Sequence, residues 1–171
     1  MKTINIKING SMYTETVPVR MLLVDFVRET IGLTGTHVGC TYEGVCGACT
    51  IHLDGEAVKS CLMLAIQADG HEITTVEGLA NNSEQTPLQT AFNEQHGLQC
   101  GFCTPGFVMS LFSMYKNHNS YNSDLIKDTI SGNLCRCTGY RPIVDAAKSL
   151  NKVDFKDLSL IHISEPTRRT P

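Results

Sequence analysis

The eight cysteines of this 171-residue chain are the residues whose type and spacing could do chemistry. They fall into two groups of four, Cys40, Cys46, Cys49 and Cys61, and Cys100, Cys103, Cys135 and Cys137. Thiolate sulfur binds zinc or the irons of a cluster, so each group could form one four-cysteine metal site. The chain begins with alternating apolar and polar residues and lacks the continuous apolar segment of a signal peptide. We therefore expect a cytoplasmic protein, where disulfides are uncommon and cysteines ligate metal.

The spacing of the first group predicts a 2Fe-2S cluster. Three of its cysteines lie in one glycine-rich segment, and the fourth follows Cys49 after eleven residues. A plant-type 2Fe-2S site has four residues between the first two ligands and two residues between the next two. The second gap matches this pattern, but five residues separate Cys40 from Cys46. Such a cluster is anionic, and Gly44 and Gly47 would let backbone N–H groups turn toward the sulfur atoms.

The second group is less distinctive. Cys100 and Cys103 precede a helix expected from Pro105, and helix N-termini favour anions such as thiolates. Cys135 and Cys137 lie in the turn between two later helices. A C-x2-C pair joined with a C-x-C pair could hold either a 2Fe-2S cluster or zinc. From the residues alone, a zinc-stabilised interaction module without a redox role and a free two-cluster ferredoxin remain alternatives.

Hydrophobic alternation in the first half predicts a sheet. Strands are expected over residues 4–8, 13–17, 50–53, 56–60 and 73–76, and a helix over 22–27. The dipeptides Asn9–Gly10 and Asp54–Gly55 are typical of two-residue hairpin turns. Together these signals predict a helix lying across a small mixed sheet.

The second half changes to a helical period. Four short helices are expected to start near Thr86–Pro87, Thr104–Pro105, Ser123 and Pro142. Helices this close in sequence predict a compact bundle. The polar stretch 81–85 is the expected boundary, which gives domains over 1–80 and 81–157. The tail 158–171 has no periodicity and nothing to bury, and we interpret it as a disordered or artefactual end.

Composition excludes several classes of function. The net charge is −3 without a cluster of Lys and Arg, which predicts no nucleic-acid partner. No apolar stretch approaches the length of a transmembrane segment. No paired carboxylates, nucleophile elbow or phosphate-binding loop stands out, so the chain lacks an obvious substrate-converting site of its own. Five scattered histidines are expected to be surface or capping residues, His37, His52, His71, His96 and His118.

The segments that carry the cysteines resemble a known family. The segments 97–106 and 132–140 are similar to the signatures of the xanthine dehydrogenase family of molybdenum hydroxylases, and the segments 33–40 and 53–61 add to that similarity. The resemblance extends over about residues 4–150. It is strongest to a separate small iron–sulfur subunit, as in aerobic molybdenum-type carbon monoxide dehydrogenases.

This resemblance implies an α+β chain, with a β-grasp, plant-type ferredoxin-like domain followed by a four-helix bundle domain. Each domain would hold one 2Fe-2S cluster on its four cysteines. The implied partners are a large subunit with molybdopterin and a medium subunit with FAD. Single electrons would pass from molybdenum through the helical-domain cluster and the ferredoxin-domain cluster to FAD. Gln99 would hydrogen-bond the pterin, and Cys137 would be the ligand nearest to it.

One departure from the family pattern concerns the first group. The family has four residues between the first two ligands, whereas residues 41–45 make five here. We expect the loop to bulge outward and keep Cys40 as a ligand; otherwise Cys40 is displaced and the cluster is labile. A large apolar patch near Gln99 and Cys137 would argue against a free ferredoxin. The resemblance does not select among carbon monoxide, aldehydes, N-heteroaromatics and purines as the substrate.

Overall fold

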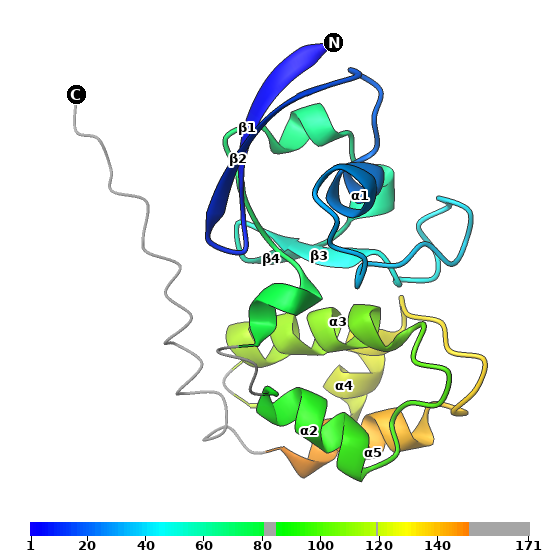
Figure 1. Cartoon of the computed structure of the whole chain (residues 1–171). Helices are drawn as coiled ribbons and strands as arrows, with labels where there is room; N and C mark the ends of the chain where they lie inside the picture. Colours follow the sequence, from blue (N-terminus) through cyan, green and yellow to red (C-terminus); the bar gives the residue numbers. More distant parts are fainter. Residues whose placement is uncertain (81–84, 119, 151–171) are drawn as a thin grey trace, which may run out of the picture.

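The computed structural model describes residues 1–80, 85–118 and 120–150, in which a sheet half lies against a helical half (Figure 1). Each half has its own hydrophobic core, one built on the strands and the other on the helices. Most of the expected boundary stretch, residues 81–84, lies outside the described residues. The tail 158–171 lies outside them too.

The sheet half holds one five-stranded mixed sheet. Its strands are β1 (Lys2–Ile8), β2 (Ser11–Val17), β3 (Thr50–Leu53), β4 (Glu56–Lys59) and β5 (Glu72–Thr74). The strand order is β2-β1-β5-β3-β4, with β1 and β5 parallel and the other neighbours antiparallel. Ile4, Ile6 and Ile8 are all buried on one face, as their alternation predicts. The predicted mixed sheet is therefore confirmed, although its last strand ends two residues early.

Both predicted hairpin turns are present. Asn9 and Gly10 have φ of 49° and 84°, and Asp54 and Gly55 have φ of 51° and 89°. Two successive residues with positive φ match the right-handed twist of the strands that they join. These turns fix the register of β1 with β2 and of β3 with β4.

The helix expected over 22–27 differs from the prediction. A three-residue α1 (Leu23–Asp25) passes directly into a π-helical turn, η1 (Phe26–Thr30). The N–H of Ile31 donates to the Phe26 carbonyl, five residues back, over 3.0 Å. Leu23, Phe26 and Val27 are all fully buried in the sheet core, so packing rather than local helix propensity sets this geometry.

Short 3₁₀ turns connect the remaining parts of the sheet half. They are η2 (Ser60–Leu62), η3 (Ala65–Ala68) and η4 (Val76–Leu79). The turn η2 follows β4 directly and carries Cys61. The position of this cysteine is therefore set by a sheet strand and not by the loop that carries the other three.

The helical half contains α2 (Pro87–Glu94), α3 (Thr104–Asn117), α4 (Ser123–Ile130) and α5 (Arg141–Ser149). Thr86 caps α2 as predicted, because its hydroxyl accepts a hydrogen bond from the Gln89 N–H. The cap of α4 is Asn122, one residue before the predicted start. With α1, the described residues include five α-helices. Every helix in the described ranges is too short or too polar to span a bilayer.

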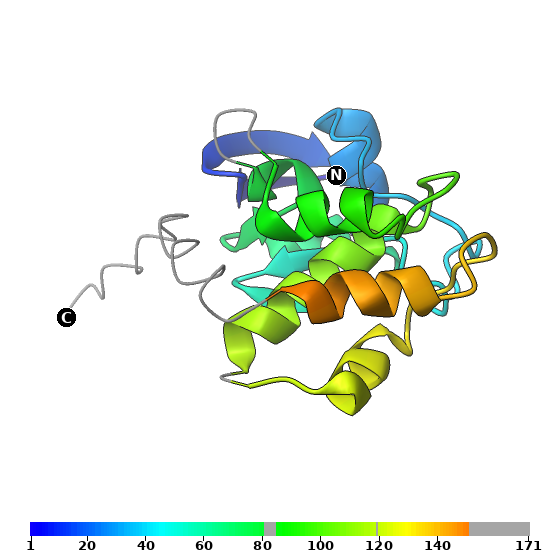
Figure 2. The ribbon, with the colours of Figure 1, turned by 90° about the horizontal axis from the view of Figure 1, so that it is seen from below.

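Helix α3 connects the two halves because it packs against both β3 and β4 (Figure 1). Met109 and Met114 on this helix are buried in the helical core, as the sequence predicts. The loop between η1 and β3, the loop before α3 and the turn before α5 gather on one side of the molecule, and the view from below agrees (Figures 1 and 2). These three loops carry seven of the eight cysteines.

Candidate metal centres

The structure gathers the cysteines into four pairs of thiols. In the first group, Cys40 contacts Cys46, and Cys49 contacts Cys61. In the second group, the sulfurs of Cys100 and Cys137 lie 3.6 Å apart, and Cys103 contacts Cys135. All eight side chains are free thiols. The two predicted groups are therefore also groups in space, and each consists of two pairs.

Four thiolates can bind either one zinc ion or a cluster of two irons. A structural zinc ion takes four ligands at one point. A 2Fe-2S cluster instead has two irons, each held by two of the four protein ligands. Sulfurs at 2.3 Å from a tetrahedral metal are about 3.8 Å apart, close to the 3.6 Å between Cys100 and Cys137. The residues present thus fit a two-iron cluster in each group.

The extra residue between Cys40 and Cys46 is taken up by an unusual backbone. Thr41 and Tyr42 have φ of 54° and 68°, in the left-handed region that non-glycine residues rarely adopt. Tyr42 is 43% exposed, and its hydroxyl donates to the Asp25 carboxylate over 3.2 Å. The loop therefore bulges toward solvent, while the Cys40 sulfur stays beside Cys46.

Backbone donors stabilise the thiolate of Cys40. Burial alone would raise its pKa, but the N–H groups of Cys46, Val45 and Glu43 point at the sulfur. These hydrogen bonds, with that of the Cys46 side chain, lower the pKa of Cys40 to about 7. The loop thus offers the concentration of N–H donors that an anionic cluster requires.

The other pair of the first group is more deeply buried. Burial and the neighbouring Cys49 thiol raise the pKa of Cys61 to about 12, while the Gly44 N–H acts in the opposite direction. Cys49 and Cys61 share a small apolar cluster with Val24 on α1. Water is excluded from this side of the site, so only a positively charged partner such as iron would keep both sulfurs ionised.

Side-chain hydroxyls form hydrogen bonds with one cysteine of the second group. The Cys135 N–H donates to the Tyr140 hydroxyl oxygen over 3.0 Å, and the Cys135 sulfur lies 3.1 Å from the Thr138 hydroxyl. Burial would raise the pKa of Cys135, but the Thr138 hydroxyl, with the N–H groups of Thr138 and Cys137, lowers it. Burial and the neighbouring Cys135 raise the pKa of Cys103 to about 12.

The second group has an inner and an outer pair. Cys103 and Cys135 are largely covered, whereas Cys100 and Cys137 are exposed. Hydrogen bonding to the Cys100 thiol raises the pKa of Cys137. Gln99 is exposed and is the chain neighbour of Cys100. The outer pair is therefore the part of this site that another molecule could approach.

A cavity of about 390 Å³ joins the two groups. Its lining includes six cysteines, Cys40, Cys46, Cys100, Cys103, Cys135 and Cys137. The side chains of Leu98, Phe102 and Leu134 are exposed apolar residues on the two loops that carry the second group. Exposed apolar side chains grouped beside polar ones are typical of a surface that another protein covers.

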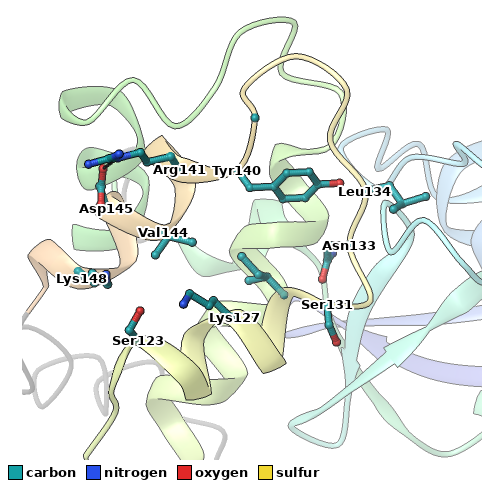
Figure 3. Close-up of a pocket in the computed structure, with 12 residues that line it drawn as sticks. Ser123, Lys127, Ser131, Asn133, Leu134, Tyr140, Arg141, Val144, Asp145 and Lys148 are labelled. Carbon is teal, nitrogen blue, oxygen red and sulfur yellow. Dashed lines mark ion pairs between the residues drawn. The ribbon is translucent and has the colours of Figure 1, made fainter.

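The larger cavity of about 700 Å³ lies elsewhere, between α4 and α5 (Figure 3). Lys127 and Ser123 line it from α4, and Arg141, Asp145 and Lys148 line it from α5. No cysteine lines this cavity, so its size does not make it a metal site. It touches the second group only through the turn before α5, which also supplies part of its wall.

Two histidines that were expected to be surface or capping residues connect the two halves of the chain. His52 is only 3% exposed, and its Nε2 lies 2.9 Å from the Met109 carbonyl on α3. Its strand is covered on both faces, because the helical half packs on the side that the sheet core leaves open. Half-buried His37 stacks on Phe102 with ring centroids 4.5 Å apart, and its Nδ1 is 2.7 Å from the Phe102 carbonyl.

Asn133 was not singled out by the sequence, yet it is almost fully buried between the two sites. Its side chain contacts the Gly47 carbonyl and the Ser110 hydroxyl. Its position could have indicated a role, because it lies two residues before Cys135 within the segment that carries the family resemblance.

Comparison with known proteins defines the class. Residues 6–80 match the family described as "2Fe-2S iron-sulfur cluster binding domain". Residues 75–148 match the family described as "[2Fe-2S] binding domain". The chain is thus a protein of two 2Fe-2S families in tandem.

Relatives define the family more narrowly. The chain is 54% identical over 151 residues to caffeine dehydrogenase subunit gamma of Pseudomonas sp. (strain CBB1), covering 86% of this chain and 90% of the relative. It is 49% identical over 143 residues to the nicotine 6-hydroxylase small subunit of Paenarthrobacter nicotinovorans, covering 84% and 86%. The crystal structure of quinoline 2-oxidoreductase from Pseudomonas putida 86 aligns with a TM-score of 0.85 and 45% identity, covering 90% of this chain and 93% of that one.

The chain belongs to the family of small iron–sulfur subunits of xanthine dehydrogenase-type molybdenum hydroxylases. Its function is electron transfer through 2Fe-2S clusters, with catalysis on partner chains. The predicted resemblance is confirmed, and the zinc module and the free ferredoxin are not supported. The closer likeness to carbon monoxide dehydrogenase small subunits stays a prediction.

Proposed function

We propose that each group of four cysteines holds one 2Fe-2S cluster and that the chain relays electrons from the second group to the first. The ligands of the first cluster are Cys40, Cys46, Cys49 and Cys61. The ligands of the second cluster are Cys100, Cys103, Cys135 and Cys137. When bound, each cluster accepts and releases one electron at a time.

The arrangement of the thiols in two pairs per group carries this proposal. Cys40 with Cys46 and Cys49 with Cys61 offer two bidentate positions, as two irons require. The extra residue does not prevent this, because the bulge at Thr41 and Tyr42 leaves the Cys40 sulfur beside Cys46. We therefore retain Cys40 as a ligand.

The proposal includes the finer fold and the domain limits. The mixed sheet crossed by α1 and η1 supports a β-grasp, plant-type ferredoxin-like domain over residues 1–80. Helices α2 to α5 share one core, which supports a four-helix bundle domain over residues 81–157. The separate cores support two units, each built around one cluster.

We propose that the partners are a large molybdopterin-binding subunit and a medium FAD-binding subunit, together in the cytoplasm. The exposed outer pair, Cys100 and Cys137, is accessible to the large subunit, and the exposed Leu98, Phe102 and Leu134 supply apolar contact area. Cys137 is then the ligand nearest the pterin. Gln99, exposed beside this pair, has the amide donor and acceptor to hydrogen-bond a pterin ring.

We further propose that the partner converts an N-heterocyclic substrate. Two relatives of similar length are named for caffeine and nicotine, and one structural neighbour is named for quinoline. All three names denote compounds with nitrogen-containing rings. The small subunit would serve such an enzyme without contacting the substrate itself.

The test is metal analysis of the full chain purified without oxygen. We expect about four irons and about four acid-labile sulfides per chain, and two distinct 2Fe-2S signals after reduction. Cys40→Ser should abolish the signal of the first cluster and leave the second. Cys137→Ser should do the reverse.

Val45→Ala is the matched control, because Val45 lies in the same loop with an exposed apolar side chain. It should leave both signals intact. Zinc in place of iron, or an unchanged first signal in Cys40→Ser, would contradict the ligand assignment. Oxidation of caffeine, nicotine or quinoline by the complex from the native host would test the substrate class, and exclusive turnover of aldehydes would contradict it.

A further inference from the structure

One hydrogen bond joins the two cysteine groups directly. The N–H of Leu134 donates to the carbonyl oxygen of Cys46 over 2.9 Å. Cys46 belongs to the first group, and Leu134 is the chain neighbour of Cys135 in the second. A route from one cysteine side chain to the other therefore runs through covalent bonds and this single hydrogen bond, without a step through empty space.

Asn133 is a buried residue next to this hydrogen bond. Its side-chain amide nitrogen lies 3.4 Å from the Gly47 carbonyl, and its side-chain oxygen accepts a hydrogen bond from the Ser110 hydroxyl over 3.0 Å. Its own N–H donates to the Ile130 carbonyl at the end of α4. Asn133 is thus hydrogen-bonded to the loop between η1 and β3, to α3 and to α4. Figure 3 shows Asn133 and Leu134 on the segment after α4, beside the ribbon of the sheet half.

Two glycines allow the backbones to come this close. A Cβ on Gly47 would lie 2.4 Å from the Asn133 amide nitrogen and 2.5 Å from the Gly132 carbonyl oxygen. A Cβ on Gly106 of α3 would lie 2.2 Å from the Gly47 carbonyl oxygen. Lys59 adds a further connection, since its ammonium group donates to the Gly132 carbonyl over 3.0 Å. The two backbones are therefore closely packed around this hydrogen bond.

We propose that the Leu134–Cys46 hydrogen bond is the electronic bridge between the two cysteine sites, and that Asn133 is the positioning residue that fixes its geometry. The inference rests on the proposed ligand sets. Each transfer moves one electron from the second site to the first, so the second is oxidised by one electron and the first is reduced by one. No proton or atom moves, and the fixed backbone contact requires no rearrangement between transfers.

The contact between His37 and Phe102 is the competing route. It also joins the loop between η1 and β3 to the loop that carries Cys100 and Cys103. His37 Nδ1 lies 2.7 Å from the Phe102 carbonyl oxygen, and the two rings stack. However, His37 is three residues from Cys40, so this route is longer in covalent bonds than the one through Cys46 itself. His37→Ala should therefore leave the rate between the clusters unchanged.

The experiment measures electron transfer between the clusters in the full chain with both clusters assembled. Asn133→Ala removes the amide that holds Gly47, and Asn133→Asp replaces its donor with an acceptor that faces the same carbonyl. After rapid photoreduction, equilibration between the clusters should slow by about tenfold or more in both variants, the low end of outer-shell effects at metal sites. The magnetic splitting between the reduced clusters should also change. Ser110→Ala, which removes only the support of Asn133, should give a smaller change in the same direction.

Asn122→Ala is the matched control, because it removes an asparagine that caps α4 without touching the bridge. It should destabilise the helical half and leave rate and splitting at the wild-type values. Two cluster signals with an unchanged rate in Asn133→Ala, Asn133→Asp and Ser110→Ala would overturn the bridge. If Asn133→Ala and Asn133→Asp fail to assemble clusters, the Ser110→Ala rate decides. A wild-type chain without a second cluster signal would instead overturn the proposed function.

Discussion

The two cysteine groups differ in how the chain assembles them. In the sheet half, Cys40, Cys46 and Cys49 lie in one short loop, and only Cys61 comes from elsewhere, twelve residues later. In the helical half, 31 residues separate the pair Cys100 and Cys103 from the next cysteine, Cys135. The first site is therefore largely local in sequence, whereas the second exists only when α3, α4 and α5 pack.

The hydrogen bonds at the two sites also differ. Backbone N–H groups of the loop itself surround the Cys40 sulfur. At the second site, the side chains of Thr138 and Tyr140 contact Cys135 in addition to the N–H groups of Thr138 and Cys137. The second site thus also uses side-chain hydroxyls, and the ring of Tyr140 packs against Phe107 in the helical core. The second site should accordingly be the more sensitive to core packing.

The largest expected effect comes from removing a core aromatic residue in the helical half. Phe107 is fully buried, and its ring lies edge-on to Tyr140 at 6.2 Å. Phe107→Ala should lower the free energy of unfolding by about 3–5 kcal/mol and selectively weaken the second cluster signal. Denaturant unfolding followed by the two cluster signals measures both effects.

Phe26→Ala is the matched control in the sheet half, because Phe26 is also fully buried. It should cost a similar free energy but weaken the first cluster signal. If Phe107→Ala removed the first signal before the second, the assignment of each site to its own core would be wrong.

Substitutions at two glycines distinguish the cost of backbone strain from the cost of disturbing the contact between the halves. Gly47 and Gly139 have φ of +71° and +67°, but only Gly47 has neighbours that an added Cβ would strike. Gly139→Ala should cost roughly 1–2 kcal/mol of strain. Gly47→Ala should cost about 1–3 kcal/mol more because it pushes the halves apart. Thermal unfolding of both variants tests this, and equal losses would contradict a role for Gly47 in the contact.

Loss of one hydroxyl tests the side-chain support of the second site. Tyr140→Phe leaves the Cys135 N–H without its partner and should cost about 1 kcal/mol, with faster loss of the second cluster under a chelator. Tyr115→Phe is the control, since that hydroxyl donates to the Ala147 carbonyl in the same half. Equal rates of cluster loss in the two variants would refute a specific role for Tyr140.

The smallest effect concerns pH and the contact between the halves. Burial lowers the pKa of His52 below its usual 6.5, so the folded protein holds it neutral. The unfolded chain takes up a proton as the pH falls through 6.5, so stability from this residue is present above that pH and is lost below it. The loss should not exceed about 1.4 kcal/mol per pH unit.

Denaturant unfolding of the wild type and His52→Gln between pH 5 and 8 measures this term. The glutamine can still donate toward the Met109 carbonyl but cannot take up a proton. The difference between the two proteins should therefore grow as the pH falls below 6.5. A difference that is independent of pH would show that His52 does not titrate in this range.

Local signals in the sequence were sufficient for much of the fold. The hairpin turns at Asn9–Gly10 and Asp54–Gly55 and the helix cap at Thr86 follow from the chemistry of a few adjacent residues. The π-helical turn after α1 was not predicted, because it depends on the burial of Phe26 and Val27 against the sheet. Burial of His52 was missed for the same reason, since nothing in its own strand shows that α3 covers the second face.

The sequence by itself determined the type of ligand, the division into two groups and the local loop around Cys40, because cysteine chemistry and short spacings are properties of neighbouring residues. Only the tertiary structure decided that Cys100 meets Cys137 and that Leu134 reaches Cys46. These contacts join residues far apart in the chain. Their positions are set by the packing of helices on a sheet, which no spacing within one segment encodes.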